Sequence, residues 1–324
     1  MSISESNRII RGIIINNGRV SIVLLNWNGE EDTVECLESL KKIDYSDYDI
    51  YLVDNDSKEN SVNYIKNYLE HDDYYSFDIK TKNDLDNYYK PADIDVLFIL
   101  NDENSGFAGG NNVALNYISE KKISDYIVLL NNDTIVSNDF INGLLDKFNE
   151  SDDTGFVGIN HYYYDNRTTL QTVGGGKVDL VHGEAMAITS KGTVHDFDFI
   201  TGSCILMSLN ILLDVGLMSE DFFMYWEDVD WSTIAREHGY KLRVSDYGYI
   251  FHKEGASIKS LSRIYYHTRN RIFYMKRHTT GLKYYKFIIY IILYVLKESV
   301  TNMTKNSSYS KTLLKGLKDG LLKN

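Results

Sequence analysis

Four clusters of polar side chains each follow a short apolar run within the first 135 residues. Such runs are typical of strands that are buried on both faces. A single cluster could be a turn, because Asn and Asp are turn residues. Four clusters on successive strands favour one ligand crevice, since ligands of open parallel sheets bind beyond the carboxyl ends of the strands. The clusters are Asn26-Trp27-Asn28, Asp54-Asn55-Asp56-Ser57, Asn101-Asp102-Glu103-Asn104 and Asn131-Asn132-Asp133-Thr134.

A glycine-rich segment follows the third cluster and leads into a helix predicted over residues 109–119. Glycines allow a backbone to approach a ligand closely, and the N-terminus of a helix favours phosphate. The G-x-G-x-x-G fingerprint of dinucleotide-binding proteins belongs after the first strand, where this sequence lacks it. The candidate ligand-binding residues of this segment are Asn104, Gly106, Gly109 and Asn111.

Three carboxylates and one histidine could supply the remaining chemistry. Asp133 ends a predicted strand, Glu227 and Asp228 precede a predicted helix, and His252 follows a strand-like run. One carboxylate and one distant histidine, completed by diphosphate oxygens and water, suit Mg²⁺ or Mn²⁺. Asp133 and His252 are therefore the candidate metal ligands. Taken alone, a histidine such as His252 is more often a surface or core residue than a ligand, and Asp228 could serve to cap its helix.

The elements that must position these residues alternate between strand and helix as far as residue 135. Strands are predicted over 20–26, 50–53, 95–100 and 126–130. Helices are predicted over 30–42 and 109–119, and another helix follows the second strand and ends at residue 69. This alternation predicts an α/β fold with a mostly parallel, doubly wound sheet. After residue 149 we expect a small antiparallel insertion (162–164, 174–176, 189–192), a strand over 200–207, and helices over 229–238 and 261–277.

Composition narrows the class of protein. The chain has 324 residues, of which 43% are hydrophobic and 25% charged, as in a globular protein. Its net charge of −12 disfavours a nucleic-acid partner. The part after Lys253 is nevertheless basic and includes Lys259, which suggests an anionic ligand or surface there. Cys36 and Cys204 are expected to be buried thiols in a reducing cytosol, and we expect no signal peptide.

The C-terminal part contains two apolar patterns. Residues 287–296 are intensely apolar, but a run of ten is too short to span a bilayer, which takes about 20 residues. Residues 311–323 place leucines on one helical face against lysines. Both patterns are typical of interfacial helices on an anionic membrane. The alternative is packing on the domain or in a homodimer.

Together these segments resemble the family 2 glycosyltransferases, especially the bacterial rhamnosyltransferase-like branch. The resemblance implies a GT-A fold with a catalytic domain over 19–275, divided into a nucleotide-binding half (19–135) and an acceptor half (136–275). Residues 1–18 would be an N-terminal extension, and 276–324 amphipathic helices. The matching segments are 25–28, 53–57, 103–112, 130–134, 201–204, 223–230 and 252–255.

The resemblance also implies roles. Asp54 matches the residue that binds the donor's base, and Asp228 matches the catalytic base, with Glu227 as the lesser candidate. The family's D-x-D position is occupied by Asn131-Asn132-Asp133, so that Asp133 is its one carboxylate ligand and Asn131 is left to contact the ribose. His252 matches a further metal ligand. The other residues with implied donor contacts are Asn26, Trp27, Asn28, Asn55 and Asn132.

Substrates follow from the resemblance as expectations. The donor would be a nucleotide sugar, with dTDP-L-rhamnose favoured and UDP-galactose, UDP-glucose, UDP-GlcNAc and UDP-galactofuranose left open. The acceptor would be a lipid-linked or growing surface glycan, met by Trp226 and by Arg269 on the aromatic, basic helix. The protein would then be cytoplasmic and peripheral on the inner face of the plasma membrane.

Two other classes of protein stay open. A sugar nucleotidyltransferase would carry a glycine-rich, basic loop directly after the first strand, whereas residues 26–30 contain no basic side chain. A non-catalytic nucleotide-binding protein is favoured slightly by the Asn at position 131. It is disfavoured because both Asp133 and Asp228 are present.

Overall fold

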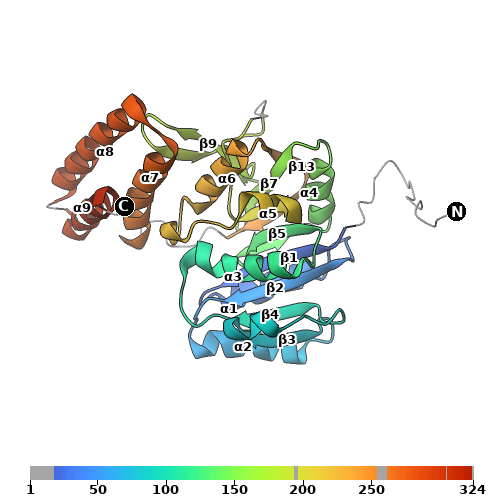
Figure 1. Ribbon diagram of the computed structural model, residues 1–324. Helices are drawn as coiled ribbons and strands as arrows, with labels where there is room; N and C mark the ends of the chain where they lie inside the picture. The colour runs from blue at the N-terminus through green and yellow to red at the C-terminus, as the bar shows by residue number, and fades with distance from the viewer. Residues whose placement is uncertain (1–17, 193–195, 254–260, 304, 323–324) are drawn as a thin grey trace.

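The computed structural model describes residues 18–192, 196–253, 261–303 and 305–322. Almost all of the predicted N-terminal extension, together with Gly255 and Lys259, lies outside these ranges. A ten-stranded sheet forms the centre of the molecule, in the order β3-β4-β2-β1-β5-β12-β7-β13-β6, with β8 paired to β7 (Figure 1). A second sheet has three strands in the order β10-β9-β11. This architecture is the predicted α/β fold with a small antiparallel insertion.

The first part of the chain, residues 19–135, contains the four predicted strands, and they run parallel to one another. Their sequences are continuous apolar runs because both faces of the sheet are covered by helices. The strand β3 (Phe77–Thr81) was not predicted; it pairs at the sheet edge and is only half-buried, so its apolar signal is weak. The predicted strands are β1 (Val20–Asn26), β2 (Tyr48–Asp54), β4 (Val96–Leu100) and β5 (Tyr126–Asn131).

The second half of the chain extends the sheet and corrects two predictions. The run predicted as one strand over 200–207 is broken by a turn at 201–203, so β11 (Phe199–Ile200) joins the small sheet and β12 (Cys204–Ser208) the large one. Residues 189–192 form no strand, and the hairpin partner of β9 (Gly175–Asp179) is β10 (Glu184–Ala187). The remaining strands are β6 (Thr134–Val136), β7 (Thr154–Tyr163), β8 (Leu170–Thr172) and β13 (Lys241–His252).

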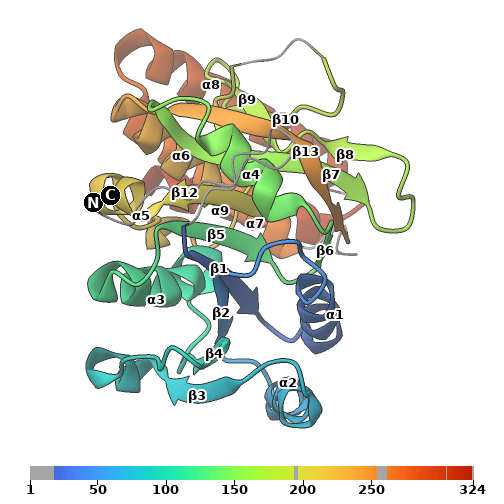
Figure 2. The same cartoon turned by 90° about the vertical axis from the view of Figure 1, so that its right-hand side faces the viewer.

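Helices cover both faces of the large sheet, as Figure 2 shows for α3 on one side and α1 and α2 on the other. Each face has its own hydrophobic core: one includes Val23, Leu115 and Trp231, the other Leu24, Leu37 and Phe140. Both cysteines are free and buried, as predicted. The helices on the sheet are α1 (Glu30–Leu40), α2 (Glu59–His71), α3 (Gly106–Lys121), α4 (Phe140–Phe148), α5 (Leu209–Val215) and α6 (Glu227–Glu237), with short 3₁₀ helices at Lys82–Asn87 and Glu220–Phe222.

Three C-terminal helices, α7 (Leu261–His278), α8 (Gly281–Asn302) and α9 (Ser307–Leu322), build a third core against α6 and the small sheet. The predicted boundary at residue 275 falls inside α7. Helix α9 packs closely on α7, because a side chain at Gly316 or Gly320 would collide with that helix. Of its leucine face, Leu313 and Leu317 are buried within the molecule, whereas Leu314 and Leu321 stay exposed. Among the described residues, no helix has the length and apolarity required to cross a bilayer.

Candidate active site

The carboxyl ends of β1, β2, β4 and β5 lie at one edge of the sheet. Asn26 pairs in register with Asp54, Leu25 with Asn131, and Asp54 with Leu100. All four polar clusters therefore meet at this edge, as the strand pattern predicts.

Asn26 and Asp54 form the buried base of this edge. Asn26 is fully buried; its amide donates to Asp54 Oδ1 at 2.7 Å and accepts from Thr33 Oγ1 at 3.1 Å. Asp54 Oδ2 accepts the backbone N–H of Ser57 at 2.9 Å. The Asn26 amide is thus engaged with the protein, and this residue orders the loops around the site. Trp27, by contrast, is 56% exposed at the rim.

A network of amides orders the glycine-rich segment. The Asn55 side chain donates to Asn104 Oδ1 at 3.1 Å and to the Gly106 carbonyl at 3.0 Å, and it accepts from Asn101 at 3.1 Å. Asn104 Oδ1 in turn accepts the Gly106 N–H at 2.9 Å. Gly106 has φ of +72°, and a Cβ there would lie 2.2 Å from the Phe223 carbonyl oxygen. The segment can take this path only with glycine.

The other predicted donor residues lie around this segment. Asn28 has φ of +52°, and its side chain accepts the Lys58 N–H at 2.9 Å. Asn111 is buried in α3 and donates to the Phe107 carbonyl at 2.9 Å, one turn before it. Asn132 donates to Thr33 Oγ1 at 2.8 Å. Gly109 belongs to the first turn of α3. These side-chain amides hold the loops at the sheet edge in place. A bound donor would therefore contact their backbone groups and those of their polar atoms that make no hydrogen bond within the protein.

Asp133 and His252 are brought together by the pairing of β6 with β13. His252 lies opposite Thr134, and its Nε2 is 3.4 Å from Asp133 Oδ1. Nδ1 of His252 is 2.9 Å from Gln171 Oε1, and in the tautomer that donates Nδ1–H to this oxygen Nε2 is available to bind a cation. Asp133 Oδ1 is buried without a hydrogen-bond partner among the described residues. The carboxylate oxygen of Asp133 and the ring nitrogen of His252 face each other, and such a pair of atoms fits a bound cation.

The structure adds His161, which the sequence analysis missed. It is fully buried in β7, and its ring lies 5.9 Å from that of His252. Burial, followed by the neighbouring His252, lowers its pKa to about 3, so the ring is neutral. Its Nε2 is 2.6 Å from Ser203 Oγ. No pattern marked this residue, because a histidine in a buried strand resembles a core residue.

The loop before Glu227 and Asp228 is strained and tightly held. Phe223, Tyr225 and Trp226 have φ of +65°, +65° and +78°, which is unfavourable for residues with side chains. The fully buried Asn270 amide donates to the carbonyls of Phe222, Met224 and Tyr225, each at 2.8 Å. A strained backbone that a buried side chain holds in place is typical of functional sites.

Arg269, like Asn270, holds the loop before Glu227 in place. Its Nη2 donates to the carbonyls of Asp221 at 2.9 Å and Phe222 at 2.8 Å, and Nε donates to Asn270 Oδ1 at 2.8 Å. The residue is almost fully buried. The charge of Arg269, which the resemblance places on the acceptor side, is thus turned toward the loop.

Glu227 and Asp228 begin α6; Glu227 is buried and Asp228 is half-buried where it borders the surrounding loops. Burial, with the charges of Asp228 and Asp230, raises the pKa of Glu227 well above its ordinary range. Burial also raises the pKa of Asp228, but backbone N–H groups of Gly202 at 3.0 Å and Val229 at 2.9 Å donate to its carboxylate and oppose this effect. Glu227 is thus the more readily protonated of the two acids.

The turn at 201–203 connects these acids to the other half of the site. Gly202 donates its N–H to Asp228 Oδ2, and the next residue, Ser203, accepts the Asn131 N–H at 3.0 Å. A Cβ at Gly202 would lie 3.3 Å from that of Asp228. The break between β11 and β12 therefore fixes Asp228 relative to the Asn131-Asn132-Asp133 segment.

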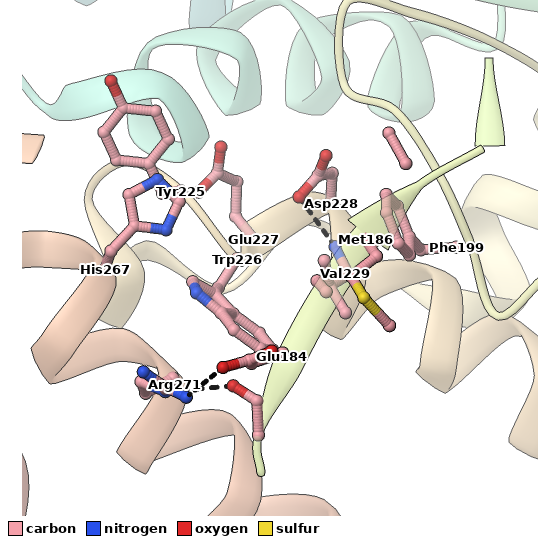
Figure 3. Close-up of a pocket in the computed structure, with 13 residues that line it drawn as sticks. Glu184, Met186, Phe199, Tyr225, Trp226, Glu227, Asp228, Val229, His267 and Arg271 are labelled. Atoms are coloured by element: carbon pink, nitrogen blue, oxygen red, sulfur yellow. Dashed lines mark hydrogen bonds and ion pairs between the residues drawn. The ribbon is translucent and has the colours of Figure 1, made fainter. Parts of the chain in front are cut away.

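A cavity of about 410 Å³ opens beside the two acids (Figure 3). Trp226, predicted on the acceptor side, lines it, as does Arg271, which was not predicted. Arg269 does not line it. The other walls come from the β9–β10 hairpin, Phe199, Tyr225 and His267.

Two family descriptions match this chain: "Glycosyl transferase family 2" over residues 21–212 and "Glycosyl transferase family group 2" over 126–314. Among curated proteins, a teichoic acid poly(glycerol phosphate) polymerase of Staphylococcus epidermidis is 24% identical over 243 residues, which cover 73% of this chain and 28% of the relative. The low-salt glycan biosynthesis hexosyltransferase Agl10 of Haloferax volcanii is 20% identical over 227 residues, 67% of this chain and 61% of the relative. The chain thus spans less than two thirds of either relative.

Solved structures share the fold. The mannosyltransferase PcManGT of Pyrobaculum calidifontis, in complex with GDP-Man and Mn²⁺, is 11% identical with a TM-score of 0.59, covering 95% of this chain and 88% of that one. S. aureus TarS in complex with UDP-GlcNAc is 15% identical with a TM-score of 0.54, covering 94% and 80%. The first family match takes in more than half of the 324 residues. The chain therefore belongs to glycosyl transferase family 2 and has the GT-A fold.

Proposed function

We propose that this protein is an inverting glycosyltransferase that moves a hexose from a nucleotide diphosphate to a hydroxyl group of a lipid-linked or growing surface polysaccharide. The observation that carries the proposal is the position of Asp228. Its carboxylate borders the cavity and is joined through the 201–203 turn to the segment that holds Asp133. Family membership and the named hexosyltransferase relative support the same reaction class.

In this proposal Asp228 is the general base. Its carboxylate takes the proton of the acceptor hydroxyl, the hydroxyl oxygen bonds to the anomeric carbon, and the bond from that carbon to the nucleotide diphosphate breaks. The two backbone N–H groups favour the ionised form of Asp228 and oppose the effect of burial on its pKa, while burial and the neighbouring charges favour the protonated form of Glu227. Two neighbouring acids whose pKa values are driven apart are suited to such a division of roles.

Asp133 and His252 would hold a Mg²⁺ or Mn²⁺ ion. Asp133 Oδ1 is buried and has no hydrogen-bond partner within the described ranges, and together with the facing Nε2 of His252 it fits such an ion. Bound there, it would supply positive charge to the donor diphosphate. No group of three or more His, Cys, Asp or Glu side chains with metal-site spacing occurs in the described parts of the chain, so donor oxygens would complete the shell. PcManGT and GalNAc-T7 were solved with Mn²⁺.

The identity of the donor rests on fewer observations. The motifs that resemble the rhamnosyltransferase-like branch favour dTDP-L-rhamnose, whereas relatives of this fold were solved with UDP-GlcNAc and GDP-Man. Asp54 would meet the base, at the buried end of the edge that Asn131 and Asn55 also line. A thermal-shift panel of these nucleotide sugars and the other UDP-sugars, each with Mn²⁺, selects among them, because the tightest ligand raises the melting temperature most.

Helix α8 supports a peripheral position on an anionic membrane, which we propose to be the inner face of the plasma membrane. Its outer side carries an exposed apolar stripe. With a rotation of about 100° per residue, the exposed Lys283, Lys286 and Lys297 lie along one edge of this stripe. Such helices lie in the lipid interface. The stripe consists of Leu282, Tyr285, Ile289, Leu293, Leu296, Val300 and Met303.

Flotation with phosphatidylglycerol liposomes tests this position. We expect Leu293→Glu to abolish flotation and Leu213→Glu, at an exposed leucine of α5, to leave it unchanged. Concentration-dependent dimerisation that Leu293→Glu disrupts, without flotation of the native protein, would instead assign the stripe to a homodimer.

Asp228→Asn tests the reaction itself. We expect the variant to bind donor and Mn²⁺ normally while transfer falls by about 10²-fold or more, the usual effect of removing a general base. Near-normal transfer by a folded, donor-binding Asp228→Asn protein would refute the assignment. Formation of a nucleotide sugar from a sugar phosphate would indicate a nucleotidyltransferase. Donor binding with neither transfer nor hydrolysis by the native protein would indicate a non-catalytic nucleotide-binding protein.

A further inference from the structure

The cavity beside Asp228 has two chemically different ends (Figure 3). Glu227 and Asp228 lie at one end, and Arg271 at the other, with the Trp226 ring between them. His267 lies over Tyr225, with ring centroids 4.4 Å apart. A ligand that fills this cavity therefore meets acids at one end and a guanidinium at the other.

Arg271 is a buried cation that its surroundings neutralise only in part. Its Nε donates to the Gly183 carbonyl at 3.0 Å and its Nη2 to the His182 carbonyl at 2.6 Å, and these partners carry no charge. The carboxylate of Glu184 is 3.6 Å away and half-exposed. Burial lowers the pKa of Arg271 in spite of that carboxylate. A second anion in the cavity would therefore be stabilised.

His267 also lines the cavity, where its ring is stacked on that of Tyr225 one turn of α7 before Arg271. Burial, followed by the charges of Arg263 and Arg271, lowers its pKa to about 4, so the ring is neutral and adds no competing charge. Its Nε2 is buried without a hydrogen-bond partner among the described residues. Glu227 Oε2 is likewise buried and unpartnered there, at the acidic end. A buried polar atom without a partner is costly, and a ligand that supplies one recovers that free energy.

We infer that this cavity binds an acceptor that carries an anionic oxygen group, a phosphate ester or a carboxylate, in addition to the hydroxyl that receives the sugar. Arg271 binds the anionic group, and the Glu227–Asp228 end receives the hydroxyl, with the unpartnered His267 Nε2 offering the ligand a further polar contact. A volume of about 410 Å³ suits one sugar residue with its charged substituent. The inference deepens the proposed function and rests on it for the identity of the ligand as acceptor.

A matched series of small molecules tests the inference by binding rather than by turnover. Glucose, glucose 1-phosphate and glucuronate are titrated into the full chain in the presence of saturating UDP and Mn²⁺. We expect at least one of the two anions to bind about tenfold tighter than glucose or more, as a charge-assisted hydrogen bond provides. The anion that binds tighter identifies the phosphate or the carboxylate as the group recognised. Equal binding of all three would overturn the inference.

Two substitutions with opposite effects guard against a merely structural role of Arg271. Arg271→Gln should abolish the preference for the anion, and Glu184→Gln should increase it several-fold, because it removes the carboxylate that competes for Arg271. A misfolded protein cannot bind more tightly, so the second variant stays informative if the first fails to fold. Lys276→Gln, an exposed cation on the same helix, is the matched control.

The outcomes separate this inference from the proposed function. If Arg271→Gln and Glu184→Gln change the anion preference of a protein that transfers no sugar, the anion-binding site is supported and the proposed transferase function is refuted. Transfer to neutral and anionic acceptors alike, with neither variant changing the ratio, keeps the function and overturns the site.

Discussion

Asn270 lies outside the cavity, yet we expect its loss to impair the reaction more than the binding of the donor. Asn270→Ala removes the amide that donates to the carbonyls of Phe222, Met224 and Tyr225 at 2.8 Å each. It also removes the acceptor of the Arg269 Nε–H. The loop that these contacts hold runs directly into Glu227 and Asp228.

The size of the expected effect follows from comparing the backbone strain of the loop with the free energy of the hydrogen bonds that hold it. The loop contains three side-chain-bearing residues with φ between +65° and +78°, each costing about 1–3 kcal/mol. The two N–H groups of the Asn270 amide are worth about 1–3 kcal/mol each, because the carbonyls they satisfy are buried. Without the amide the strain is no longer balanced, and the loop relaxes. A loss of about 3 kcal/mol in positioning Asp228 corresponds to about 10²-fold in kcat.

Steady-state transfer kinetics and calorimetric binding of UDP with Mn²⁺ test this prediction together. We expect kcat to fall by about 10²-fold while the Kd for UDP changes by no more than about twofold, since β1, β2, β5 and α3 form the donor edge. Asn149→Ala, which removes the hydrogen bond from an exposed amide to the Leu145 carbonyl at the end of α4, is the control for losing a side-chain amide elsewhere. A folded Asn270→Ala protein with kcat within about threefold of the native value would refute the reasoning.

Two further predictions concern the metal and pH. Asp133→Asn and His252→Ala should each weaken UDP binding by about tenfold or more with Mn²⁺ present and leave metal-free binding unchanged; equal losses with and without Mn²⁺ in calorimetry would contradict the ligand assignment. Burial lowers the pKa of His278, but its contacts with Asp230 and Glu237 outweigh this effect and raise the pKa above 6.5. The stability it adds is therefore fully present below pH 6.5 and lost as the pH rises through the raised pKa. Urea unfolding from pH 6 to 9 should show this loss in the native protein and not in His278→Gln.

The strand ends illustrate what the sequence determined by itself. Continuous apolar runs alternating with helices leave a parallel sheet as the arrangement that buries both faces, and parallel strands must end at one edge. The convergence of Asn26, Asp54, Asn101 and Asn131 was therefore predictable without coordinates. The acidic pair at 227–228 was also predictable, because carboxylates at a helix start are a local pattern.

Pairings between distant segments were decided only by the tertiary structure. Asp133 and His252 are neighbours because β6 pairs with β13, a contact between strands more than a hundred residues apart. Packing likewise decided that Arg271, and not Arg269, lines the cavity. The two residues differ by about 200° in direction along the helix, so the face that meets the cavity determines which of them lines it. Helices α8 and α9 carry comparable apolar patterns, yet the glycines of α9 let it pack against α7, whereas α8 keeps a second apolar side exposed. Local sequence sets each element and its apolar faces, but the partner of each face depends on shape complementarity across the whole chain.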